Sequence, residues 1–181
     1  MLLEAARRRA LDRDSHIGEC VANLRLPPPK RFLTQLRAYL IHQRDEYRHP
    51  GTHVEGLLRK VESNRQWTLN LGPTIDKGSL ETGHFVLRSG ARMSCGITLR
   101  EEGSHSSLVG YRFDYRFHAQ SAESVFRFDL RKEAHSFALK EARAHVHLGT
   151  EAIRIPTILI DPFEVLDYLF YVADPHVGGY L

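Results

Sequence analysis

The chain has few cysteines and no long apolar run. Its two cysteines, Cys20 and Cys95, match no CxxC or zinc-ribbon spacing, so a thiolate metal site is not expected. No stretch approaches the roughly 18 apolar residues of a membrane span. Leu2 and Leu3 are followed at once by charged residues, unlike the apolar core of a signal peptide. These absences predict a cytoplasmic protein without a membrane span, whose thiols are reduced.

The short motifs of several common enzyme classes are also missing. The sequence has no GxGxxG, P-loop, HExxH or nucleophile-elbow pattern. Its formal net charge of +3 permits an anionic partner but does not require one. What the chain does have is 11 histidines in 181 residues. Histidine chemistry is therefore the first place to look for a function.

The first third of the chain has a helical pattern. We expect an N-terminal helix and proline-rich connector over residues 1–29, ending in the run Pro27–Pro29, and then a single domain over 30–181. Apolar residues at three- and four-residue spacing predict a helix from Lys30 to about His49. Thr52 and Glu55 then form a possible capping box, which predicts a second helix and a helical hairpin over 30–65.

The rest of the domain changes to a two-residue period, which is typical of strands. We expect an antiparallel β-meander of about five to six strands over 66–156. A closing helix over 162–173 follows, because Asp161 is a favourable N-cap, Pro162 suits the first helical position and Glu164 completes a capping box. The predicted fold class is α+β, with the closing helix packed on the apolar side of the sheet.

Three of the predicted strands carry an unusual set of polar side chains. Alternation puts aromatic and aliphatic residues on one face and almost only arginine, aspartate and histidine on the other. The segments are 111–118, 125–131 and 143–148. Their polar rows are Arg112, Asp114, Arg116 and His118; Arg127, Asp129 and Arg131; and Arg143, His145 and His147. So many cationic residues on adjoining strands would repel one another without an anionic partner.

Arginine and histidine together suit phosphate chemistry. Guanidinium groups bind phosphate oxygens with a planar fork, and histidine exchanges protons near neutral pH. Metal-independent RNA cleavage needs an acid, a base and cations that stabilise charge on the phosphate. We assign His145, His147 and His135 as catalytic candidates, with His118 as an alternate. The candidates for substrate binding are Arg112, Arg116, Arg127, Arg131 and Arg143, and Asp114 and Asp129 would orient them.

Two other interpretations of this face remain open. The spacing His145-x-His147 is also typical of metal ligands, with His135, Asp114 or Asp129 as further donors. Five arginines on the same face argue against a divalent cation, so we expect neither a metal nor any other cofactor. Alternatively, arginine and aspartate form only cross-strand ion pairs, which stabilise little when exposed.

The same residues resemble a known family. An aromatic strand, then Arg127-Phe128-Asp129, then His145-x-His147-x-x-Gly149 and a short closing helix resemble the TumE-like toxins of bacterial toxin–antitoxin pairs, over about residues 107–171. The resemblance implies a small α+β toxin with a cognate antitoxin. The order of elements is also similar to the RelE-type ribonuclease toxins, as a fold analogy only. Leu130 stands where a polar residue would be expected, and the helical first third has no counterpart.

Two functions follow as hypotheses. The first is a toxin-like protein of a prokaryotic toxin–antitoxin or defence system, acting as a metal-independent endoribonuclease through the arginine and histidine face. The second is a non-enzymatic subunit of a bacterial defence complex that holds nucleic acid or an acidic protein on that face. The expected partners are a cognate antitoxin or a defence-complex protein, with RNA as the possible substrate or ligand.

Overall fold

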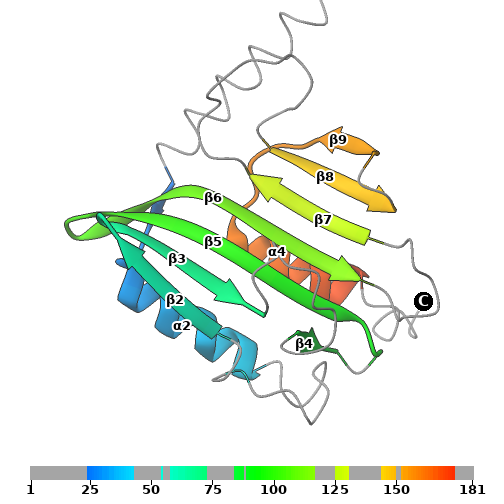
Figure 1. Cartoon of the computed structure of the whole chain (residues 1–181), viewed down its shortest axis with the longest axis horizontal. Coiled ribbons are helices and arrows are strands. Elements are labelled where there is room, and N and C mark those ends of the chain that lie inside the picture. Colours follow the sequence, from blue (N-terminus) through cyan, green and yellow to red (C-terminus); the bar gives the residue numbers. More distant parts are fainter. Residues whose placement is uncertain are drawn as a thin grey trace, which may run out of the picture.

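Alternating apolar and polar side chains form one antiparallel sheet in the computed structural model (Figure 1). The structure describes residues 24–42, 54, 58–72, 84–87, 89–116, 125–130, 144–149 and 152–173. The strands are β1 (Arg25–Leu26), β2 (Leu58–Ser63), β3 (Gln66–Leu71), β4 (Phe85–Val86), β5 (Arg92–Glu102), β6 (His105–Arg116), β7 (Val125–Leu130), β8 (Ala144–Gly149) and β9 (Arg154–Pro156). The helices are α2 (Pro29–His42) and α4 (Pro162–Tyr168), which continues as the π-helical segment η1 (Leu169–Ala173).

The strands follow one another across the sheet almost in chain order. The main path is β2-β3-β5-β6-β7-β8-β9, while β1 pairs with β6 and β4 pairs with β5. This is the expected α+β arrangement with an antiparallel meander and a closing helix. The described part has nine strands rather than five or six.

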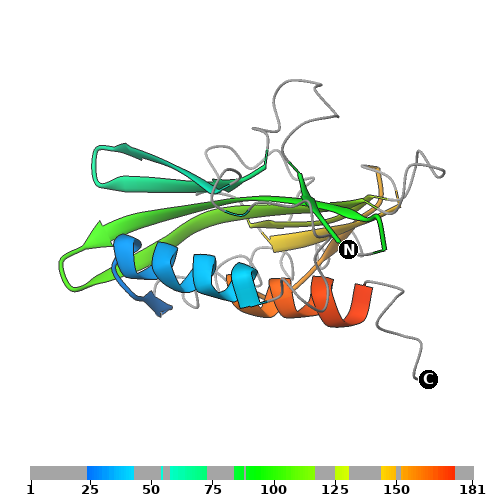
Figure 2. The same ribbon diagram turned by 90° about the horizontal axis from the view of Figure 1, so that it is seen from below.

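Both helices cover the same face of the sheet, as Figure 2 shows. Phe163 of α4 contacts Phe32 and Tyr39 of α2, with ring centroids 5.3 and 5.7 Å apart. The Tyr39 hydroxyl also donates a hydrogen bond to Asp167 Oδ1 at 2.6 Å. The face that these helices cover includes Met93, Cys95, Ile97, Tyr111, Phe113, Tyr115, Phe128, Leu130, Ala144 and Val146, all buried. The hydrophobic effect therefore fixes which face of the sheet points inward, and the arginine and histidine rows take the other.

The start of the closing helix agrees with its prediction. The Asp161 side chain accepts a hydrogen bond from the Phe163 N–H at 2.8 Å, and the Glu164 carboxylate accepts one from the Asp161 N–H at 3.0 Å. This is a complete capping box with Pro162 as the first helical residue. At the other helix, Pro29 is the first residue of α2 rather than part of the connector.

The predicted helical hairpin over 30–65 is wrong from Leu58 onward, and residues 43–53 and 55–57 lie outside the described part of the chain. Leu58–Ser63 is strand β2, paired with β3, and Val61 is exposed instead of buried. Asn64 and Arg65 have φ values of 48° and 62°, which suit a tight two-residue turn between antiparallel strands. The pairing with β3 overrides the local helical signal. Residues 1–29 are the predicted N-terminal helix and proline-rich connector, and all but the last six of them lie outside the described residues.

In the described part of the chain, no helix has the length and apolar character needed to cross a membrane.

Candidate functional site

The three polar rows are neighbours in the sheet, as their alternation predicts. Arg112 of β6 lies opposite Asp129 of β7, and Asp114 lies opposite Arg127. On the other side of β7, Arg127 lies opposite His147 of β8, and Asp129 lies opposite His145. A register shift of one residue would have put these side chains on the helix side. The pairing therefore brings two arginines, two aspartates and two histidines onto adjacent strands.

Four of these residues form a compact group, here called the Arg–Asp–His cluster: Arg127, Asp129, His145 and His147. Arg127 Nε donates to Asp129 Oδ2 at 2.8 Å, and Arg127 Nη2 lies 2.6 Å from His147 Nε2. The same carboxylate oxygen is 3.4 Å from His145 Nε2 and 3.3 Å from His147 Nε2. The two imidazole rings are 4.9 Å apart at their centroids. Asp129 Oδ2 is thus the common neighbour of one guanidinium and two imidazoles.

The contact with Arg127 sets the hydrogen-bonding role of His147 Nε2. A guanidinium has only donors, so Arg127 Nη2 donates and His147 Nε2 accepts in this contact. Because Nε2 of His147 and Oδ2 of Asp129 are both acceptors, Arg127 bridges them.

Asp129 is the negative charge of the cluster. Burial, the strongest single influence, raises its pKa. The nearby His145 imidazole and the positive charges of Arg127 and Arg112 act in the opposite direction, and the net pKa lies below its ordinary value. The carboxylate is consequently ionised at neutral pH.

The cluster is far less accessible than the predicted catalytic role requires. His145 and His147 are 2% and 0% exposed, and Arg127 is 6% exposed. A histidine that transfers protons to or from RNA must reach the ribose or the leaving oxygen. In this conformation neither ring is open to a molecule of that size.

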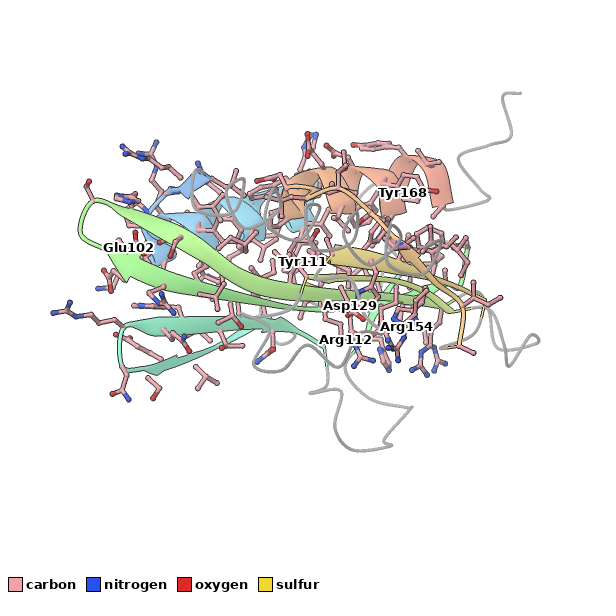
Figure 3. The ribbon with its side chains drawn as sticks, turned by 90° about the horizontal axis from the view of Figure 1, so that it is seen from above. Glu102, Tyr111, Arg112, Asp129, Arg154 and Tyr168 are labelled. Atoms are coloured by element: carbon pink, nitrogen blue, oxygen red, sulfur yellow. The ribbon has the colours of Figure 1, made fainter. Side chains whose placement is uncertain are left out.

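The accessible cations surround the cluster on the same face. Arg116 is exposed near the end of β6, and the Arg112 side chain is 34% exposed while its Nε binds Asp114 Oδ2 at 2.9 Å. In Figure 3, Arg112, Asp129 and Arg154 lie on one side of the sheet, and Tyr111 and Tyr168 lie on the other. The remaining predicted residues, His135, Arg131, Arg143 and the alternate His118, fall outside the described part of the chain.

The structure adds three residues that the sequence did not single out. Arg154 of β9 lies opposite His147, and Arg92 of β5 lies opposite Arg116; both are exposed. The pKa of His84 is lowered, first by burial and then by the charges of Arg92 and Arg116, which places it beside them. The alternation of polar and apolar residues in Arg92-Met93-Ser94-Cys95 could have predicted that Arg92 lies on the polar side of the sheet.

We call the resulting surface the polar face. It consists of Arg92, Ser94, Arg112, Asp114, Arg116, Arg154 and the Arg–Asp–His cluster.

Among the described residues, one set has donor atoms placed for a metal ion. Asp129, His145 and His147 each offer one atom, and the three atoms lie within 4.8 Å of one another. Cys95 is not near this chemistry, because it lies on the helix-covered face, and burial raises the pKa of its thiol to about 12. It is a free thiol buried in the core.

Comparisons with known proteins found no match among family models, curated proteins or solved structures. The function must be inferred from the geometry of the polar face.

Proposed function

We propose that this protein is a toxin-like component of a prokaryotic toxin–antitoxin or defence system that holds RNA on its polar face. The observation that carries the proposal is the group of accessible arginines on one face of the sheet: Arg92, Arg112, Arg116 and Arg154. Guanidinium groups in such a group bind the phosphates of a single strand as a charged track. A cognate antitoxin or a defence-complex protein is the proposed protein partner.

Two features favour binding over a purely structural sheet. Arg92 and Arg116 lie directly opposite each other on paired strands, so their guanidinium groups come from neighbouring positions of the same face. Both side chains are exposed, so a ligand in solution can reach them. A phosphate at this position can contact both guanidinium groups.

The burial of the Arg–Asp–His cluster favours holding RNA over cleaving it. The cluster then has the role of fixing the strands that present the accessible arginines. Arg127 and Asp129 form an ion pair at 2.8 Å between side chains that are 8% and 12% exposed, and such a pair is geometrically well defined.

Substitution of the accessible arginines tests the binding proposal. We expect Arg116→Ala and Arg154→Ala each to weaken binding of a fluorescently labelled single-stranded RNA in anisotropy titrations. The matched control is Arg100→Ala, an exposed arginine at the opposite end of β5. Equal affinities for all three variants and the wild type would contradict the proposal. Binding of labelled polyglutamate by a protein that does not bind the labelled RNA would point instead to an acidic protein partner.

Cleavage of RNA is the second candidate, supported by a specific feature. The unprotonated Nε2 of His147 is a suitable general base once the cluster is opened to substrate. In that case, His147→Ala abolishes both RNA cleavage and cell toxicity while the protein stays folded. Cleavage that persists in His147→Ala and His145→Ala would exclude these residues as acid and base.

A further inference from the structure

We infer that Asp129, His145 and His147 form a binding site for a divalent first-row transition-metal ion. This site is distinct from the RNA-binding role of the accessible arginines. Its ligands would be two imidazole nitrogens and one carboxylate oxygen, the set found in two-histidine, one-carboxylate metal centres. Three protein ligands leave at least one coordination position for water or another ligand.

The positions of the donor atoms support the site. Donors about 2.0–2.1 Å from a tetrahedral ion are separated from each other by about 3.3–3.4 Å. Asp129 Oδ2 is 3.4 Å from His145 Nε2 and 3.3 Å from His147 Nε2, so two of the three separations already fit. The third separation, between the two histidine nitrogens, is at most 4.8 Å, and the two atoms would move closer together when an ion binds. The two histidines come from alternate positions of one strand, which gives them a common direction.

The arginines oppose an ion less than their number suggests. Arg112 is paired with Asp114, and Arg116 is exposed to solvent, which screens its charge. Arg127 contacts the donor atoms directly: its Nη2 lies 2.6 Å from His147 Nε2 and its Nε lies 2.8 Å from Asp129 Oδ2. An ion and this guanidinium therefore compete for the same electron pairs.

The competition gives two distinguishable states. In one, Arg127 is the cation of the cluster and no metal binds. In the other, the metal takes the nitrogen of His147 and the oxygen of Asp129, and Arg127 turns away. Replacing Arg127 with methionine removes the competing charge and keeps a side chain of similar length. If the metal site exists, Arg127→Met should bind metal at least about tenfold more tightly than the wild type.

Cobalt and zinc titrations of the full-length, untagged protein test the inference. After dialysis against a chelator, Co²⁺ should produce visible absorption bands that saturate at one ion per chain, and Zn²⁺ should displace it. Isothermal titration calorimetry then compares the variants. His145→Ala and His147→Ala should each lose more than about tenfold in affinity. His105→Ala, at the partly exposed histidine that begins β6, should bind like the wild type.

Circular dichroism separates loss of the site from loss of the fold. A ligand variant that does not fold is replaced by Asp129→Asn, and Arg127→Met remains informative because it retains all three donors. The inference is overturned if neither the wild type nor Arg127→Met binds Co²⁺. It is also overturned if His145→Ala and His147→Ala bind as tightly as His105→Ala. Because no RNA is present, the result is independent of the proposed binding function.

Discussion

At the scale of single residues, the charge of Asp129 holds the Arg–Asp–His cluster together. Its Oδ2 atom binds Arg127 and lies beside both imidazoles. Removing one partner of a buried ion pair leaves the other charge buried without compensation, which costs far more than the pair contributes as a whole. Arg127 is 6% exposed and would be left in that condition.

We therefore expect Asp129→Asn to lower the free energy of unfolding by about 3 kcal/mol at pH 7. The folded-state pKa of Asp129 lies below its ordinary value, so its stabilisation is present above the ordinary pKa. It is lost as the pH falls through the lowered folded-state value. Urea unfolding of both proteins from pH 7 into the acid range should show the difference shrinking.

Glu62→Gln, at an exposed carboxylate on β2, is the control and should change stability little at any pH. A difference between wild type and Asp129→Asn that stays constant into the acid range would contradict the ionised, paired state of Asp129.

At the scale of elements, strand register is the feature that the sequence predicts well. Alternation along residues 111–116, 125–130 and 144–148 assigns each side chain to a face, and burial of the aromatic rows then fixes the register. The sequence does not reveal Arg154, because a three-residue strand such as β9 is too short to show a period. Nor does it show that the two histidines are buried, since burial depends on what packs over them.

The end of the second predicted helix, from Leu58 onward, was wrong for a different physical reason. A capping box and an apolar spacing are local signals for a helix. Strand β2 forms instead because all six of its residues pair with β3, which is a contact between different segments of the chain. Lys60 also lies over the Trp67 ring, 4.7 Å from its centroid, which adds a cross-strand contact. Asn64 before Arg65 was the available signal of a tight turn, because asparagine tolerates a positive φ.

Arg65→Gly tests this turn. Arg65 has a φ of 62°, which glycine adopts without strain, so we expect the free energy of unfolding to rise by about 0.5–1 kcal/mol. In a helix the same substitution would lower it by about 1 kcal/mol. Thr68→Gly, inside β3, is the matched control and should destabilise the protein. Thermal or urea unfolding measures all three proteins.

At the scale of the whole molecule, the helices and the polar face divide the sheet between them. Helices α2 and α4 pack on one side (Figure 2), and Arg112, Asp129 and Arg154 lie on the other (Figure 3). The exposed arginines at the second side are available for binding although the Arg–Asp–His cluster is buried, and their charge favours an anionic partner. The fold thus accounts for how a chain of modest net charge presents a locally cationic surface.

The salt dependence of RNA binding tests this account most directly. If three to four arginines of the polar face neutralise RNA phosphates, a plot of log K against log salt for a single-stranded RNA should have a slope of about −2 to −3. Removing Arg116 and Arg154 together should bring the slope closer to zero by about 1.4. A wild-type protein that does not bind RNA at low salt, or that binds with a slope unchanged by both substitutions, would contradict the proposed role of the polar face.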